Sequence, residues 1–211
     1  MPKLHFRFGA MASGKSVQLL VAAHQYAKTG KRAFIMKPAR DTRDGVLVSC
    51  RVPNMGREVD LIVQVSEDVP LQVLYEYDVI LVDEVQFLTP EQVEQLSLLS
   101  LQVPVICYGL RADYRGVMFP AIQKLMALAD DISEIKNICK FCPRKATQNL
   151  KLKATELLRH DETLPASIEV GGDDMYCGVC RRCWYDHRAR HAPTTSLFQS
   201  SSPLMFGNNN K

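Results

Sequence analysis

The chain has 211 residues and a mass of 23.8 kDa, which suits one domain or one domain with a small appendage. Hydrophobic residues make up 46% and charged residues 23%, and no run of about 18 apolar residues occurs, so the composition excludes a largely disordered chain and a membrane-spanning helix. The formal net charge of +3 and the pI of about 8.4 fall short of the basic character of a dedicated nucleic-acid binder.

Residues 4–134 alternate between short apolar strands and helices. In chain order we expect a strand at Leu4–Phe8, a helix at Lys15–Thr29 that Gly30 closes, a strand at Arg32–Lys37 that Pro38 stops, a polar loop at Asp41–Gly45, a strand at Val79–Val82, a helix that begins at Thr89, a strand at Val105–Tyr108 and a helix at Pro120–Ala129. Thr89 is predicted to cap its helix because a proline follows it and Gln92 stands three residues on. This rhythm predicts an α/β fold with a mainly parallel sheet covered by helices on both faces.

A phosphate-binding motif lies between the first predicted strand and the first predicted helix. Residues 9–16 match the pattern G-x-x-x-x-G-K-[ST] in full. The glycines let the backbone N–H groups face the phosphates, and the helix dipole adds favourable charge. Lys15 is placed to reach the terminal phosphates, and Ser16 is placed to hold Mg²⁺. We therefore predict a nucleoside triphosphate site formed by Gly9, Ala10, Met11, Ala12, Ser13, Gly14, Lys15 and Ser16.

Two carboxylates, Asp83 and Glu84, directly follow the buried strand predicted at Val79–Val82. The carboxyl ends of parallel strands line the crevice in which ligands bind in open α/β sheets. Asp83 is placed to hold Mg²⁺, and Glu84 is placed to orient or deprotonate a nucleophile. The alternative is a solvated acidic turn. The pair alone leaves open whether water, a small molecule or a protein accepts the phosphoryl group.

Five of the seven cysteines crowd into the last third of the chain. An odd number cannot all pair, and charges interrupt the N-terminus before a secretion signal could form, so we expect metal rather than disulfides and a reduced, cytoplasmic protein. Two C-x-x-C units can close one tetrahedral structural Zn²⁺ site. Its predicted ligands are Cys139, Cys142, Cys180 and Cys183.

Other roles for the cysteines stay open on spacing alone. Cys177 also forms a C-x-x-C unit with Cys180, so spacing does not choose between the pairs. Free buried thiols and a redox dithiol are the alternatives to a metal site. Cys50 and Cys107 are isolated, and we expect both to be small core residues.

The chain divides into three predicted parts. Residues 1–135 form a nucleotide-binding α/β domain, residues 136–191 form a small metal-binding lobe, which we call the zinc lobe, and residues 192–211 form a flexible polar tail.

Together these motifs resemble the type II (cytosolic-type) thymidine kinases. The matching residues span positions 4–185 in the family's order: the phosphate loop, residues 37–43 (Lys-Pro-Ala-Arg-Asp-Thr-Arg), residues 83–87 (Asp-Glu-Val-Gln-Phe), residues 108–116 beginning Tyr-Gly-Leu, the first cysteine pair, residues 169–172 (Glu-Val-Gly-Gly) with Tyr176, and residues 180–183 (Cys-Arg-Arg-Cys). Asn149 stands at a pocket position that is often Thr or Val in that family.

The resemblance implies a P-loop (RecA-like) parallel sheet flanked by helices, with a zinc lobe that carries a lasso loop. It implies an enzyme that transfers the γ-phosphoryl group of ATP to the 5′-hydroxyl of thymidine, with Glu84 as general base. Lys15, Ser16 and Asp83 would serve ATP and Mg²⁺, with Val85 and Gln86 at the nucleotide site. A homotetramer that the end product thymidine triphosphate inhibits is also implied.

The same resemblance implies a set of nucleoside contacts. Residues that would wall the thymine are Met11, Phe87, Leu110, Tyr114 and Phe119, and Arg51 falls near the deoxyribose side. Residues from about 152 to 176 would form the lasso, whose backbone hydrogen-bonds the base. Its contacts would include Val170, Gly171, Gly172 and Tyr176, which closes the pocket.

Two other classes of protein share some of these features. A P-loop ATPase coupled to DNA or RNA would have the same phosphate loop and acidic pair, but we find no basic stripe. A zinc-ribbon binding module with a decayed nucleotide site is disfavoured by the intact Lys15, Ser16, Asp83 and Glu84. We expect no nucleic-acid partner, and we expect the arginines of residues 181–190 to form solvated helix surface: Arg181, Arg182, Arg188 and Arg190.

Overall fold

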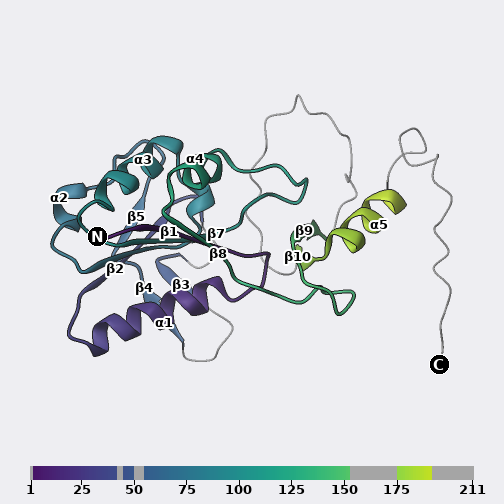
Figure 1. Ribbon diagram of the computed structural model, residues 1–211, viewed down its shortest axis with the longest axis horizontal. Coiled ribbons are helices and arrows are strands. Elements are labelled where there is room, and N and C mark those ends of the chain that lie inside the picture. The colour runs from purple at the N-terminus through teal and green to yellow at the C-terminus, as the bar shows by residue number, and fades with distance from the viewer. Residues whose placement is uncertain (1, 42–44, 50–54, 153–174, 192–211) are drawn as a thin grey trace.

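A computed structural model describes residues 2–41, 45–49, 55–152 and 175–191 (Figure 1). Several sequence predictions lie outside these residues. They concern most of the polar loop at residues 41–45, the core role of Cys50, the substrate roles of Arg51, Val170, Gly171 and Gly172, the lasso between residues 153 and 174, and the tail.

A parallel sheet of six strands forms the centre of the molecule. Its strands are β1 (Leu4–Phe8), β2 (Ala33–Pro38), β5 (Leu61–Val63), β6 (Val79–Val82), β7 (Val105–Gly109) and β8 (Asp131–Glu134). They are ordered β5-β2-β6-β7-β1-β8, and every pairing is parallel. All residues of β6 and β7 are buried, because helices cover both faces of a parallel sheet. The predicted α/β fold is confirmed.

Helices cover the two faces unequally. Helix α1 (Lys15–Lys28) lies on one face, whereas α2 (Leu71–Leu74), α3 (Pro90–Leu99) and α4 (Pro120–Leu128) lie on the other (Figure 1). Successive strand residues point to opposite faces, so Leu81 packs with the α1 side while Ile80 and Val82 pack with the α3 and α4 side. Two apolar clusters result, one on each side of the sheet.

Element boundaries agree with the sequence predictions to within a residue or so. Helix α1 ends at Lys28, and Gly30 follows with a φ of 73°, as expected of a helix-terminating glycine. Strand β2 begins and ends one residue later than predicted, with Pro38 as its last residue. The predicted capping box of α3 is present, since Thr89 and Gln92 exchange hydrogen bonds between side chain and backbone.

A smaller unit lies beyond the carboxyl ends of the sheet strands (Figure 1). It contains the antiparallel pair β9 (Gln148–Lys151) and β10 (Tyr176–Val179), followed by α5 (Arg181–His191). A separate antiparallel pair, β3 (Leu47–Ser49) and β4 (Gly56–Glu58), lies near α1. Among the described residues, no helix has both the length and the apolar character needed to cross a bilayer.

Candidate functional site

The phosphate loop and the acidic pair meet at the carboxyl edge of the sheet. The loop follows β1, and Asp83 and Glu84 follow β6, with β7 between the two strands. The Ser16 hydroxyl donates to Asp83 Oδ2 at 3.2 Å, although 67 residues separate them in the sequence. The fold therefore brings together the two side chains that were predicted to hold Mg²⁺.

The loop is curled as a phosphate cradle requires. Gly14 has a φ of 83°, and a Cβ on Gly9 would lie 2.2 Å from Ser13 Oγ, so both positions require glycine. Ala12 also has a positive φ, 59°, which costs a residue with a Cβ about 1–2 kcal/mol. Lys15 is 7% exposed, and its Nζ donates to Ala10 O at 3.3 Å within the loop. The loop is thus held in a strained conformation by what surrounds it.

Asp83 is a buried carboxylate beside a second carboxylate. Burial and then the negative charge of Glu84 raise the pKa of Asp83 from 3.8 to about 7, while the nearby Lys15 ammonium opposes the rise. A carboxyl group in this state needs more positive charge than the protein alone supplies. A divalent cation between Ser16 and Asp83 would supply it, and oxygen ligands of this kind suit Mg²⁺.

The side chain of Glu84 is held by a neighbour two residues on. Glu84 itself has a φ of 48°, which turns the chain sharply after β6. The Gln86 amide donates from Nε2 to Glu84 Oε2 and accepts the Leu110 N–H at its Oε1 at 2.9 Å. Gly109 makes room for this bridge, because a Cβ there would lie 2.5 Å from Gln86 Oε1. Gln86 thus connects the end of β6 to the end of β7.

A second charged pair near the site was not predicted from the sequence. Lys37 is fully buried at the end of β2, and its Nζ lies 3.5 Å from Asp41 Oδ2 and donates to Leu47 O at 3.2 Å. Both residues lie in the matching segment 37–43, but nothing in the sequence predicted that they would pair.

Residues predicted to wall the nucleoside come together from distant segments. Met11, Leu110 and Tyr176 form a buried apolar cluster against which Tyr114 and Phe119 pack. Phe87 joins them through an edge-on contact with Phe119, with ring centroids 6.0 Å apart. The rings of Tyr114 and Tyr176 are also 6.0 Å apart. The arrangement is an apolar wall close to the segment that carries Glu84.

Four thiols converge in the zinc lobe. The Sγ atoms of Cys139, Cys142, Cys180 and Cys183 all lie within 4.8 Å of one another. Cys142 Sγ is 3.6 Å from Cys180 Sγ and 3.8 Å from Cys183 Sγ. Four sulfurs at about 2.3 Å from one Zn²⁺ would lie about 3.8 Å apart, so the cluster fits a structural zinc ion.

The surroundings favour the thiolate form at Cys139 and Cys180, whereas burial and hydrogen bonds with the neighbouring thiols raise the pKa of Cys183 to about 12. Burial alone would raise the pKa of Cys139, but backbone N–H donors and the neighbouring thiols outweigh it and lower the pKa to about 7. The Phe141 and Cys183 N–H groups point at Cys139 Sγ and Cys180 Sγ, at 3.5 and 3.4 Å. Since zinc binds thiolates, Cys139 and Cys180 are the two sulfurs whose surroundings favour metal binding before the ion is present.

The remaining described cysteines lie outside this cluster. Cys177 is buried in the same lobe but is not one of the four grouped thiols, and burial raises its pKa. Cys107 is fully buried in the core of the sheet, as predicted. The ambiguity left by the overlapping C-x-x-C units is therefore resolved in favour of Cys180 and Cys183.

The basic face of α5 is only partly solvated. Arg181 and Arg182 are exposed, as predicted, and the side chain of Arg190 lies outside the described part of the helix. Arg188 differs from the prediction, because its guanidinium lies 4.2 Å from the Trp184 ring centroid and donates to Arg115 O at 3.1 Å.

A glycine-containing loop after an inner parallel strand, with a buried carboxylate beside its serine, defines a P-loop nucleotide-binding protein of the α/β class. Sequence relatives narrow the class. The profile described as thymidine kinase matches residues 2–184. The chain belongs to the thymidine kinase family.

Individual thymidine kinases match the sequence of this chain over most of their own length. A thymidine kinase of Chromobacterium violaceum is 40% identical over 188 residues, which cover 88% of this chain and 99% of that protein. One of Ruegeria pomeroyi is 38% identical over 192 residues, covering 87% and 94%. One of Streptococcus pyogenes is 35% identical over 194 residues, covering 88% and 98%.

We expect Asp83→Asn to stabilise the protein in the absence of Mg²⁺ and nucleotide. The pKa of Asp83 is higher in the folded chain, so between pH 4 and pH 7 the folded state binds more protons and loses stability as the pH rises. The gain from Asn should therefore grow across this window, reaching on the order of a few kcal/mol, or several degrees in melting temperature, above pH 7.

Thermal unfolding at pH 4 and pH 8, without a chelator that would remove zinc, checks this expectation. The exposed Glu91→Gln on α3 is the matched control and should show no such pH dependence. A lower melting temperature for Asp83→Asn at pH 8 would contradict the assigned electrostatics.

We also expect about one zinc ion per chain, because four thiolates close one site. Cys139→Ser should lose most of the zinc and lower the melting temperature, whereas Cys177→Ala should keep it. Metal analysis by mass spectrometry on freshly prepared, reduced protein measures both. Zinc-free wild-type protein, or zinc loss in Cys177→Ala, would contradict the four-cysteine site.

Proposed function

We propose that this protein is a thymidine kinase that transfers the γ-phosphoryl group of ATP to the 5′-hydroxyl of thymidine, giving thymidine monophosphate for nucleotide salvage. Family membership over residues 2–184 supports the activity. The observation that carries the proposal is local: Gln86 bridges Glu84 to Leu110, so the carboxylate is fixed between the phosphate loop and the apolar wall. A base, a triphosphate cradle and a surface for a nucleobase thus share one edge of the sheet.

Each residue has a role that its position supports. Glu84 accepts the proton of the 5′-hydroxyl while the hydroxyl oxygen bonds to the γ-phosphorus. The bond between the γ-phosphorus and the bridging oxygen breaks, and ADP leaves with the electrons of that bond. Lys15 and the backbone N–H groups of the loop stabilise the charge on the transferred group. Ser16 and Asp83 would hold Mg²⁺, which neutralises phosphate charge when bound. Val85 and Gln86 remain predicted nucleotide-site residues, with the Gln86 amide engaged by Glu84.

Selection of thymine is assigned to the wall and the lasso. Met11, Phe87, Leu110, Tyr114 and Phe119 would present apolar surface to the ring and its methyl group, and Tyr176 would close the pocket; their mutual packing supports these roles. Thymine N3 is a donor where cytosine N3 is an acceptor. Backbone groups of a lasso over residues 152–176, with Val170, Gly171 and Gly172, would therefore reject cytosine by leaving buried polar groups unpaired. Arg51 is assigned to the deoxyribose side.

The wider organisation is part of the same proposal. The chain would comprise a nucleotide-binding domain to residue 135, the zinc lobe from 136 to 191 and a tail. We propose a cytoplasmic homotetramer that thymidine triphosphate inhibits. A nucleic-acid-coupled ATPase is the second candidate, but the family match spans the zinc lobe as well as the phosphate loop and favours the kinase. No nucleic-acid partner is proposed.

Phosphoryl transfer from Mg-ATP to a panel of deoxynucleosides tests the function. We expect thymidine monophosphate with little deoxycytidine monophosphate on chromatography, because the N3 donor is required for pairing. Transfer to deoxycytidine as well would support the assignment as a nucleoside kinase but would contradict the proposed selection of thymine over cytosine. ATP hydrolysis that single-stranded DNA stimulates, without a nucleotide product, would favour the second candidate.

We expect Glu84→Gln to lower kcat by about 10²–10⁴-fold, since a neutral amide cannot accept the proton. ATP binding should be largely retained, because Lys15, Ser16 and Asp83 are untouched. Single-turnover assays and calorimetric titration of ATP measure the two effects. Glu91→Gln, in the exposed first turn of α3, serves as control. Near-normal turnover in Glu84→Gln would remove the assignment of the base.

A further inference from the structure

The peptide groups of Met11, in the phosphate loop, are held by the zinc lobe. The Met11 N–H donates to Asn149 Oδ1 at 2.8 Å, and its C=O accepts from Asn137 Nδ2 at 3.2 Å. Gly178 on β10 packs against the same peptide, since a Cβ there would lie 2.8 Å from the Met11 oxygen. The shape of the loop therefore depends on residues more than 120 positions away in the sequence.

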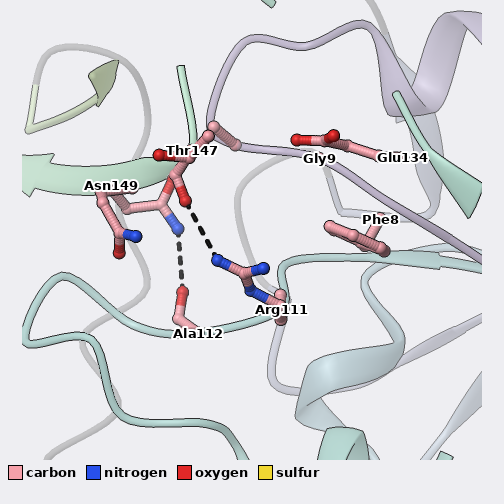
Figure 2. A pocket seen from close by; sticks show the side chains of 9 residues that line it. Phe8, Gly9, Arg111, Ala112, Glu134, Thr147 and Asn149 are labelled. Carbon is pink, nitrogen blue, oxygen red and sulfur yellow. Dashed lines mark hydrogen bonds between the residues drawn. The ribbon is translucent and has the colours of Figure 1, made fainter. Parts of the chain in front are cut away.

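The same asparagine holds a second segment. Asn149 is 6% exposed, and its Nδ2 donates to Ala112 O at 2.8 Å, in the connection between β7 and α4 (Figure 2). Arg111 of that connection donates to Thr147 O at 3.4 Å, beside the first contact (Figure 2). One amide thus spans two segments, with the phosphate loop on its oxygen and residues 110–116 on its nitrogen. These segments carry Met11 and Tyr114, two of the predicted walls of the nucleoside pocket.

Trp184 on α5 completes the connection. Its Nε1–H lies within hydrogen-bond distance of both Tyr114 O, at 3.0 Å, and Asn149 O, at 3.1 Å. The Arg188 guanidinium stacks on the indole and donates to Arg115 O. Trp184 directly follows Cys183 in the sequence, so the thiol cluster restricts where the backbone of Trp184 can lie.

We propose that Asn149 and Trp184 are positioning residues whose hydrogen bonds hold the zinc lobe against both the phosphate loop and residues 110–116. We call this set of hydrogen bonds the tie. The tie sets the separation of Met11 and Tyr114, and therefore the width of the nucleoside pocket. This inference rests on the proposed thymidine kinase activity for the identity of the nucleoside. Neither side chain takes part in the chemical step, so their loss should weaken binding more than turnover.

Asn149→Leu is the first test, because leucine has a similar size and forms neither hydrogen bond. Two backbone groups, the buried Met11 N–H and the half-buried Ala112 C=O, lose their partner. We expect the KM for thymidine to rise about tenfold and the KM for ATP about threefold, with kcat within about threefold of wild type. Zinc content should stay unchanged, since the four cysteines are intact.

Gln148→Leu is the matched control, with the same change of side chain one residue earlier on β9, where the side chain points to the other side of the strand. Both KM values should stay within about twofold of wild type. Melting temperatures are recorded for each variant. If Asn149→Leu lowers the melting temperature while both KM values stay at the wild-type level, Asn149 has only a structural role and the proposal is overturned.

Trp184→Phe provides a second variant that keeps an aromatic ring under Arg188 and removes only the indole N–H. We expect a rise in the thymidine KM of about threefold or more, with zinc retained. The double variant should show less than the product of the two single effects, because both residues act through one tie. Independent, multiplicative effects would contradict a shared tie, and an unchanged KM in Trp184→Phe would remove Trp184 from it.

Calorimetric titration of ATP separates this proposal from the proposed function. If the wild-type protein transfers no phosphoryl group to thymidine, the proposed function fails, and the tie is judged by the Kd for ATP alone. A weaker ATP Kd in Asn149→Leu, with Gln148→Leu unchanged, then supports the hold on the phosphate loop. Equal ATP Kd values in all three proteins overturn it.

Discussion

Desolvation of charge at the carboxyl edge of the sheet is the constraint around which the site is organised. Lys15 and Asp83 are both buried there, and the second carboxylate of Glu84 lies beside Asp83. Taking such groups out of water costs free energy that one ammonium only partly offsets. A triphosphate with its cation brings negative charge to Lys15 and positive charge to Asp83. The site is therefore arranged for its ligand in advance and needs little reorganisation when the ligand binds.

The zinc lobe also helps to arrange the site before the ligand binds, through packing and hydrogen bonds rather than through charge. The apolar cluster of the lobe is small and contains the cysteines themselves. A metal ion bound to them would supply the stability that a larger apolar core supplies elsewhere. Helix α5 then starts from a fixed point, and Trp184 reaches the β7–α4 connection from it. The strained φ of Ala12 next to Met11 is sustained by contacts from this lobe rather than by the loop alone. The thiol cluster, the antiparallel pair β9–β10 and the phosphate loop are thus connected by direct contacts.

Buried, regular features could be predicted from the sequence, whereas features set by tertiary contacts could not. Strands β6 and β7 are continuous apolar runs, and the capping box of α3 is local, so both are visible in the sequence. The edge strands β5 and β8 were missed because each pairs on one side only, and β8 has a single large apolar residue, Ile132, which is 40% exposed. The phosphate loop was predicted from spacing, and so was a four-cysteine site, although spacing alone left Cys177 as an alternative ligand. The contacts that Gln86, Asn149 and Trp184 make join distant segments, and no spacing rule encodes them.

The position of β1 has a consequence for the order in which the chain can fold. The first strand pairs with β7 and β8, so Leu4 can pair with Val105 only after β7 has been made. The peptide groups of Met11 likewise contact residues of β9 and β10, which are made later still. On a ribosome these partners emerge long after the N-terminus, and loop closure over such distances is slow. The contacts of the phosphate loop with β9 and β10 can form only after those strands have been made, although the loop itself is made much earlier. The full set of contacts around the peptide groups of Met11 is therefore present only in a chain that extends past residue 178.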